Sequence, residues 1–260
     1  MLFEYIFSGF IVGSLVGLTG VGGGSLMTPL LVLFFKFPTA IAVGTDLLYA
    51  AITKSAGAIS HHRLGHVDWK IVRNLLIGSL PASYLVTHHL KDIDLYSLQN
   101  VQIINTSLGI ALILTSIAVL FQPIIIQKSV KQKLKTSLNI NTLTAMLGIF
   151  LGSVVTLTSV GAGAIGVTAL LLLYPKLQLK KIIGTDIAHA VPLTFFAGIG
   201  HFNLGTIDIN LLMALLIGSV PGVMIGSKLS AKIDEKILRF ILVIILLVVG
   251  VQLIFKANYV

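Results

Sequence analysis

The sequence aligns with itself when it is shifted by 140 residues. Three motif pairs recur at that offset: GTDLLYA (44–50) with GTDIAHA, HHRLGHVD (61–68) with HFNLGTID, and LLIGSLP (75–81) with LLIGSVP. Upstream, GVGGGS (20–25) matches SVGAGA (159–164) after a one-residue gap. Because the motifs keep one order and one offset, they predict two homologous halves, residues 1–126 and 138–260, joined by a basic linker at 127–137.

The composition places this duplicated chain in a membrane. Of its 260 residues 56% are hydrophobic and only 10% are charged, whereas a soluble domain carries about 25% charged residues. The net charge of +9 comes from Lys and Arg that cluster between apolar segments, which favours lipid headgroups over nucleic acid as neighbours. Residues 2–18 lack a basic leader region and a cleavage site, so we expect them to be mature protein.

Each half contains one apolar segment broken by glycines and three plain ones. The broken segments are 3–36 and 138–175, and the plain ones are 38–60, 69–88, 98–121, 182–200, 210–230 and 237–255. A straight helix over the first broken segment would be about 50 Å long, against roughly 30 Å of hydrocarbon. Each broken segment therefore either crosses once in a distorted form or enters, turns at its glycines and leaves on the same side.

The distribution of Lys and Arg favours the second arrangement. If the broken segments cross, the flanking basic residues divide about evenly between the two sides, and no orientation is favoured. If they are re-entrant hairpins, one side receives only Lys36, Lys91 and Lys256, and the other receives Arg63, Lys70, Arg73, Lys128, Lys131, Lys133, Lys135, Lys176, Lys180, Lys181, Lys228, Lys232, Lys236 and Arg239. Cytoplasmic loops collect Lys and Arg, so we expect an inner-membrane protein with both termini outside.

These observations predict the fold class. It is an all-α polytopic membrane protein built as an inverted repeat, because three crossings per half place the second half upside down. Each half is a re-entrant helical hairpin followed by three transmembrane helices, with half-helices at 4–19 and 26–35 in the first. Internal repeats of this kind are typical of secondary transporters, although channels share them. The lipid-facing helices leave room for a homodimer without requiring one.

The glycine turns are candidate anion sites. Unwound backbone near the membrane midplane is tolerated where it is buried in protein or lines a wet cavity, and the amides of a helix N-terminus attract anions. The alternative is that the glycines only allow close helix packing. The candidate substrate-binding positions are Gly22, Gly23, Gly24, Ser25, Gly161, Ala162 and Gly163.

Three charged residues, Asp46, Lys54 and Asp186, lie within the plain segments. Ionisable groups in a membrane usually face the protein interior or a cavity. Asp46 and Asp186 are repeat mates, and His189 shares a helix face with Asp186, so this set could relay protons. Alternatively, each Asp is a structural carboxylate that caps a hairpin. Lys54 could attract an anion or extend to the interface.

Hydroxyls and histidines complete the candidate set. Thr45, Thr185 and Ser25 offer hydroxyls, although a hydroxyl within a helix often bonds its own backbone. The HHRLGH motif could suggest a metal site, but its mate keeps only Gly205 and Asp208 with one histidine. We therefore interpret the motif as a helix end followed by a helix cap and expect no metal. His61 and His201 persist in both halves and are candidate gates at opposite mouths.

The motifs resemble one known family. GVGGGSLMTPLL, AVGTD and HHRLGHVDW, followed by a weaker second copy, are similar to the TauE/SafE family, also called the toluene-sulfonate uptake permease family. The resemblance covers essentially the whole chain and implies a permease for sulfite, sulfonates, sulfoacetate or carboxylates. It also implies that the glycine turns, with Thr45 and Thr185, line the substrate site. The second turn departs from the family pattern, and Asp46 and Asp186 stand where many relatives have a small polar residue.

We therefore expect a secondary transporter of a small anion, possibly coupled to protons through Asp46, Asp186 and His189. A channel with the same repeat and a cation or metal permease using the acidic pair remain alternatives. No pairing of nucleophile and base, metal-ligand cluster or phosphate loop followed by Lys is evident, so neither an enzyme nor a cofactor is expected.

Overall fold

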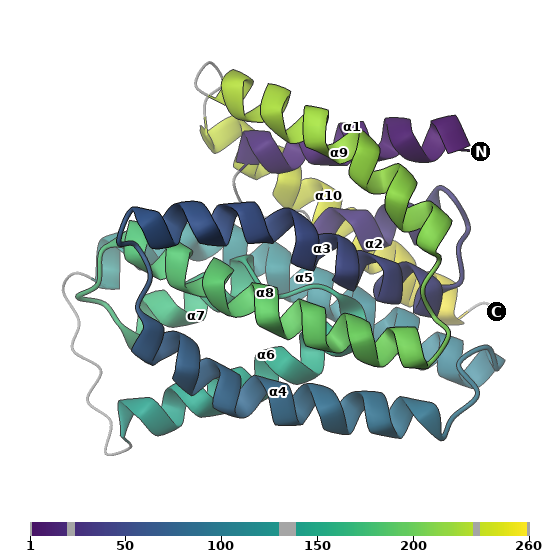
Figure 1. Ribbon diagram of the computed structural model, residues 1–260, viewed down its shortest axis with the longest axis horizontal. Coiled ribbons are helices and arrows are strands. Elements are labelled where there is room, and N and C mark those ends of the chain that lie inside the picture. The colour runs from purple at the N-terminus through teal and green to yellow at the C-terminus, as the bar shows by residue number, and fades with distance from the viewer. Residues whose placement is uncertain (1, 20–23, 130–138, 231–234, 259–260) are drawn as a thin grey trace.

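The structure is a computed structural model that describes residues 2–19, 24–129, 139–230 and 235–258. Within these ranges the chain forms ten α-helices and no strand (Figure 1). The first half contains α1 (Leu2–Thr19), α2 (Gly24–Leu33), α3 (Thr39–Arg63), α4 (Trp69–Lys91) and α5 (Leu98–Ser129). The second contains α6 (Ile140–Thr158), α7 (Ala164–Leu173), α8 (Leu179–Asn203), α9 (Ile209–Ser230) and α10 (Glu235–Asn258).

The helices occur where the sequence predicts them. Each plain apolar segment coincides with one helix, and the predicted half-helices 4–19 and 26–35 correspond to α1 and α2. The helix α5 continues to Ser129, so the first three residues of the expected linker are helical, and residues 130–138 lie outside the described part. In order, α1 to α5 correspond to α6 to α10, and the first four pairs differ in length by at most one residue, whereas α5 has 32 residues and α10 has 24.

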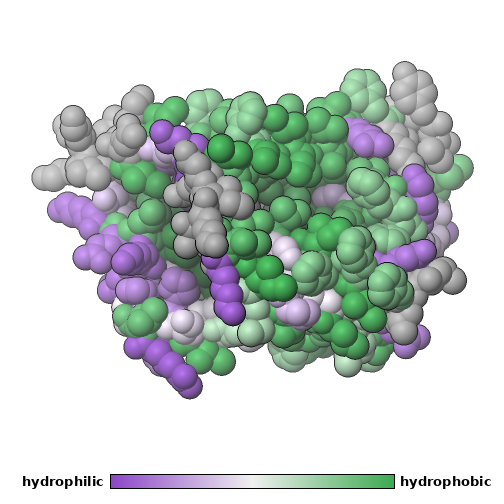
Figure 2. Space-filling model, turned by 90° about the horizontal axis from the view of Figure 1, so that it is seen from above, coloured by the Kyte–Doolittle hydropathy of each residue, from purple (hydrophilic) through white to green (hydrophobic). Residues whose placement is uncertain are grey.

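The exterior is apolar, as a bilayer requires. Large hydrophobic side chains such as Phe3, Ile77, Met224 and Phe240 are more than half exposed. Figure 2 shows hydrophobic residues over the middle of one face and hydrophilic residues gathered toward its two ends. Five helices, α5, α6, α8, α9 and α10, are long and apolar enough to cross a membrane. The chain is therefore an all-helical, multi-pass membrane protein.

The first helix of each half packs against the fourth helix of the other half. Helix α1 lies along α9, and α4 lies along α6, so the two halves are interlocked. Glycines bring the paired backbones together, because a Cβ added to any of them would lie within 2.5 Å of a carbonyl oxygen across the interface. The contacts are Gly9 with Leu215, Gly13 with Ser219, Gly148 with Leu75 and Gly152 with Ser79. The contacts occupy equivalent positions in the two halves, and the two helices of each pair run parallel.

The third and fifth helices pack against their own repeat mates, and both pairs run antiparallel (Figure 1). Gly44, near the start of α3, contacts the backbone of Thr206, just after the end of α8. Gly184, near the start of α8, likewise contacts His66, just after the end of α3. Helices α3 and α8 thus form the centre of the molecule (Figure 1).

Turns and caps follow the sequence signals. Gly65 and Gly205 both have φ of +70° just past a helix end, the left-handed conformation that glycine adopts without a Cβ clash. The Asp68 side chain accepts hydrogen bonds from the amides of Lys70 and Ile71, and Asp208 accepts one from Leu211. The HHRLGHVD motif and its mate therefore end one helix and cap the next, as expected.

The second glycine turn separates α6 from α7. Ser159 has φ of 58°, Gly161 of 118° and Gly163 of 128°, so the backbone leaves the helical conformation and α7 starts afresh at Ala164. The turn is buried: Val160 is fully enclosed and Ser159 nearly so. This confirms the predicted break in the second broken segment.

Candidate functional site

Asp46 lies on α3, against the short helix α2. The side chain is fully buried, and its Oδ2 accepts a hydrogen bond of 2.5 Å from the hydroxyl of Thr28. Ser159, from the second glycine turn, lies beside the same carboxyl group, although neither Ser159 Oγ nor Asp46 Oδ1 completes a hydrogen bond. Asp46 thus lies beside α2 of the first half and the α6–α7 turn of the second half.

Asp186 is the equivalent residue on α8, and it rests on the first turn of α7. A Cβ added to Gly166 would lie 2.0 Å from Asp186 Oδ1, so the carboxylate occupies the space that a side chain would fill. The Gly163 amide also lies beside it. The side chain is fully buried, yet neither carboxylate oxygen has a hydrogen-bond partner.

Lys54 connects α3 of the first half to the second glycine turn. Its Nζ donates a 3.0 Å hydrogen bond to the carbonyl oxygen of Ala162, and only 9% of the residue is exposed. The ammonium interacts electrostatically with both Asp186 and Asp46. Lys54 therefore points into the protein and does not extend to the membrane interface.

His189 extends this cluster toward α4. Its Nε2 lies 2.9 Å from Ser79 Oγ, and its Nδ1 is buried without a partner. The repeat mate of His189 is Tyr49, which is buried and interacts with Ser219, the mate of Ser79. Each half thus directs one polar aromatic side chain from its third helix at a serine on the other half's fourth helix.

Thr45 and Thr185 hold the two halves together. The Thr45 hydroxyl accepts a 3.1 Å hydrogen bond from the Asp208 amide, and the Thr185 hydroxyl accepts one of 2.9 Å from the Asp68 amide. Thr185 also donates to its own helix at Lys181. Both side chains are fully buried. They join each third helix to the loop before the other half's fourth helix.

The two repeat-mate histidines, His61 and His201, differ in environment. His201 is buried and uses both ring nitrogens, with Nδ1 at 2.9 Å from Thr206 Oγ1 and Nε2 at 3.0 Å from the Thr156 carbonyl oxygen. A carbonyl only accepts, so Nε2 carries a proton. His61 is half-buried beside Gly184 and His66, and its Nδ1 has no partner. In the described part of the chain, no three His, Asp or Glu side chains converge as metal ligands.

The first glycine turn is described only in part. Gly22 and Gly23 lie outside the described residues, whereas Gly24 begins α2 and Ser25 lies in its first turn. Of the second-turn candidates, Gly161 and Gly163 supply the positive φ angles and Ala162 supplies the acceptor for Lys54. The structure therefore brings Asp46, Lys54, Asp186 and His189 together around the second turn.

Several residues of this site were not predicted. Thr28, Ser79 and Ser159 are small polar residues in apolar segments, and only their full burial distinguishes them. No sequence pattern marked Gly166 as part of the site, because the glycine makes room for the carboxylate of Asp186, which is 20 residues away in sequence. A periodic pattern shows which residues share a helix face, but it does not show which other helix meets that face.

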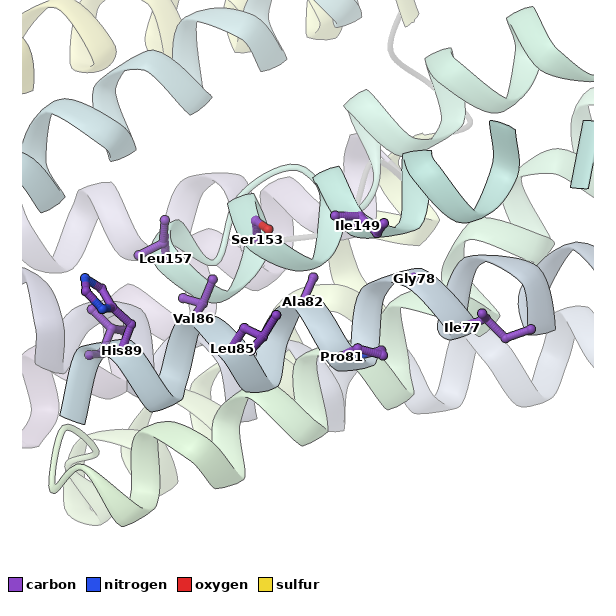
Figure 3. A pocket seen from close by; sticks show the side chains of 11 residues that line it. Ile77, Gly78, Pro81, Ala82, Leu85, Val86, His89, Ile149, Ser153 and Leu157 are labelled. Atoms are coloured by element: carbon purple, nitrogen blue, oxygen red, sulfur yellow. The ribbon is translucent and has the colours of Figure 1, made fainter. Parts of the chain in front are cut away.

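A separate groove lies between α4 and α6 (Figure 3). It has a volume of about 420 Å³ and an apolar lining, and Pro81, Leu85 and His89 on α4 face Ile149, Ser153 and Leu157 on α6. None of the buried charged residues lines it. Because Ile77, Leu85 and Ile149 are at least half exposed on the membrane-facing exterior, the groove is suited to lipid chains and is not the polar centre.

Comparisons with known proteins agree with the motifs. A family model described as sulfite exporter TauE/SafE matches residues 5–253. A probable membrane transporter protein, YjnA, of Bacillus subtilis (strain 168) is 40% identical over 98% of this chain and 100% of its own length. A second from that strain, YdhB, is 28% identical over 84% of this chain and 85% of its own. No solved structure matches. The chain belongs to the sulfite exporter TauE/SafE family of membrane transporters.

Proposed function

We propose that this chain is a secondary transporter that moves a small anion by alternating access between two inverted halves. The anion is sulfite, sulfoacetate, another sulfonate or a carboxylate. It binds near the second glycine turn, and its movement is coupled to protons through Asp46, Asp186 and His189. Both termini lie on the outer, non-cytoplasmic side of the cytoplasmic membrane.

The inversion is supported by the directions of equivalent helices. A repeat in which α3 runs antiparallel to α8, and α5 antiparallel to α10, relates the halves by a two-fold axis in the membrane plane. The Ser116 hydroxyl bonds the carbonyl of Val243, and Gly109 packs against Ile254, which gives α5 and α10 opposite directions. The reciprocal bonds of Thr45 and Thr185 repeat the relation at the two mouths.

The hairpins are supported by the course of the short helices. In Figure 1, α1 runs toward the end of the molecule that holds the α3–α4 loop, and α2 returns toward the end where α1 begins. The N-terminus of α1 and the C-terminus of α10 lie at that same end. Lys36 follows α2 and Lys91 ends α4, and both helices finish at that end. The ends of α3, α7 and α9, with Arg63, Lys176 and Lys228, lie at the opposite end. That opposite end is therefore cytoplasmic by the positive-inside rule.

The observation that carries the function is the position of the Lys54 ammonium. It is the one buried cation among the described residues, and it bonds the unwound turn between α6 and α7. A buried ammonium beside the N-terminus of α7 favours an anion through both its charge and the helix dipole.

Coupling is supported by the balance of charge around Lys54. Two carboxylates and one ammonium share a site with little access to water, and an unpaired buried charge is costly. Binding or release of a proton on Asp46 or Asp186 changes that balance by one charge. Substrate and proton would therefore influence each other's binding through a small number of contacts.

The test is flux in proteoliposomes that contain the purified chain. Labelled sulfite, sulfoacetate and acetate are measured with and without an imposed pH gradient, beside empty liposomes. We expect one of these anions to move faster when a gradient is imposed, and the double variant Asp46→Asn, Asp186→Asn to lose the response to the gradient. Equal flux in protein-containing and empty liposomes for every anion would refute the proposal.

A cation or metal permease is the second candidate, and one observation favours it. Three buried carboxylate oxygens, Asp46 Oδ1 and both of Asp186, have no hydrogen-bond partner, and a cation would satisfy them. The same liposomes distinguish the two functions, because a cation permease would release a trapped divalent cation and leave anion flux at the level of empty liposomes.

A further inference from the structure

The first turn of α7 already holds an anion that belongs to the protein. Asp186 Oδ1 lies where a Cβ of Gly166 would be, and the Gly163 amide is beside the same carboxyl group. The amides of Gly166 and Val167 are bonded to carbonyls of the turn, Gly161 and Gly163. The earlier amides belong to the first turn of this ten-residue helix, where no preceding turn supplies intrahelical acceptors.

The Asp186 carboxylate lacks the hydrogen bonds that usually stabilise a buried charge. The side chain is fully buried, and neither oxygen completes a hydrogen bond. Its stabilisation comes from the Lys54 ammonium and from the partly positive N-terminus of α7. An occupant with no completed hydrogen bond can be replaced by a ligand that makes such bonds.

The equivalent position in the first half is built differently. Asp46 receives a hydrogen bond from Thr28, and the residue equivalent to Gly166 is Met27, whose side chain is fully buried. Lys54 also has no cationic mate, because Thr194 stands at that position and donates to Ala190 of its own helix. Among the described residues, only the N-terminus of α7 therefore combines a glycine-cleared space, the Lys54 ammonium of the first half and a carboxylate with no completed hydrogen bond.

We propose that the N-terminus of α7 and the Lys54 ammonium form one anion site, that the Asp186 carboxylate occupies it in the absence of substrate, and that the substrate anion displaces Asp186 as this carboxyl group takes up a proton. The proposal rests on the anion transport proposed above and specifies how it is coupled. The ligand class is a small oxyanion, such as a sulfonate or sulfite group, whose oxygens accept bonds from amides and from an ammonium.

The exchange moves the proton and the anion across the membrane in the same direction. Lys54 on α3 is the charged group beside Asp186, and α7 presents backbone to it. Asp46 on α3 and His189 on α8 are the other titratable groups that interact with Lys54. A carboxylate and a substrate anion cannot both occupy the site, because both would compete for one ammonium. The neutral carboxyl group can leave, so one proton enters with one anion, and a monovalent anion is carried without net charge.

The test is binding of methanesulfonate and of sulfite to the purified full chain, measured by calorimetry between about pH 5 and about pH 8. Methanesulfonate keeps one charge over this range, so its affinity reports on the protein. We expect wild-type affinity to rise about tenfold for each pH unit lowered while Asp186 is ionised, with uptake of about one proton per anion. Calorimetry in buffers of different ionisation enthalpy measures that uptake.

Asp186→Asn should bind both probes without proton uptake, and its affinity for methanesulfonate should not depend on pH. Asp186→Ala provides a second variant in case the amide misfolds. Asp92→Asn, which removes an exposed carboxylate, is the control for loss of one negative charge and should keep the wild-type slope. A retained slope in Asp186→Asn, or no binding of either probe to both Asp186 variants, would overturn the proposal.

Flux separates this proposal from the one on which it rests. If wild-type liposomes move an anion in response to a pH gradient but Asp186→Asn keeps pH-dependent binding, the exchange is wrong and the transporter stands. If wild-type liposomes move no anion, the function itself is wrong. In the expected case, Asp186→Asn carries the anion but no longer follows the pH gradient.

Discussion

Lys54 of the first half donates a 3.0 Å hydrogen bond to the carbonyl oxygen of Ala162 in the second half, across 108 residues of sequence. The bond crosses from a continuous helix to an unwound turn. It places a positive charge between two carboxylates and beside a helix N-terminus. A single side chain thus links the two halves at the position where a transported anion would need a counter-charge.

Replacing Lys54 tests the use of that charge. A hydrogen bond to a charged group contributes about 1.5–3 kcal/mol, so we expect Lys54→Gln to weaken methanesulfonate binding about 10- to 100-fold. Lys70→Gln is the control, because Lys70 is exposed at the start of α4. Calorimetry on the two variants measures the difference. Equal affinity of Lys54→Gln and wild type would show that the ammonium does not contact the anion.

Thr45 and Thr185 tie each half to the other half's loop, and the resemblance also implies a role in binding substrate. Replacement by Val leaves the Asp208 or Asp68 amide without its acceptor, which costs about 1–3 kcal/mol if the amide stays buried. We expect Thr45→Val and Thr185→Val to lower the thermal midpoint in detergent. Thr53→Val is the control, since Thr53 bonds only carbonyls of its own helix.

Anion affinity then separates the two roles of these threonines. If they are ties between the halves, affinity for methanesulfonate stays at the wild-type value in both variants. Loss of affinity with an unchanged thermal midpoint would instead place the hydroxyls in the substrate site.

Gly166 should not tolerate a methyl group while Asp186 occupies its present position. A Cβ would lie 2.0 Å from Asp186 Oδ1, and overpacking of this kind costs about 1–3 kcal/mol. We expect Gly166→Ala to lower the thermal midpoint, and Asp186→Ala to relieve that loss when the two changes are combined.

Gly57→Ala is the matched control for Gly166→Ala. Gly57 also lies inside a helix, but the nearest atom to its added Cβ is 3.7 Å away, on Ile187. Alanine favours helix over glycine by about 1 kcal/mol, so this variant should be as stable as wild type or more so. Equal effects of the two substitutions would contradict the close contact at Gly166.

Membrane orientation is testable because the chain contains no cysteine. Tyr96 and Leu64 are well exposed in loops at opposite ends of the molecule. With a membrane-impermeant thiol reagent on spheroplasts, we expect Tyr96→Cys to react in intact membranes and Leu64→Cys only after permeabilisation. The reverse pattern would place both termini in the cytoplasm.

Much of the fold could be predicted because the determining signals are local. The repeat, the apolar segments and the Gly65 and Asp68 signals depend on residues close in sequence, and each corresponds to a helix, a helix end or a cap. The burial of Asp46 and Asp186 also followed, because a charge within an apolar segment must be buried in protein.

The partners of those charges could not be predicted. Lys54 has no acidic residue within one helical turn, and its acceptor is a backbone carbonyl in the other half. His189 meets Ser79 only because α4 and α6 of different halves pack together against α8. The repeat also suggested two equivalent sites, whereas the pairs Lys54 and Thr194, Gly166 and Met27, and His189 and Tyr49 make the centre asymmetric.

The most direct test of the account is accumulation of a labelled anion against its own concentration gradient. Wild-type proteoliposomes are loaded and diluted to the same sulfite or sulfoacetate concentration on both sides, and a pH gradient is imposed. The account predicts that one anion accumulates in the more alkaline compartment, and that the accumulation disappears when the gradient is collapsed. Exchange of label between the two sides without accumulation would indicate a channel, and no movement of label would contradict anion transport altogether.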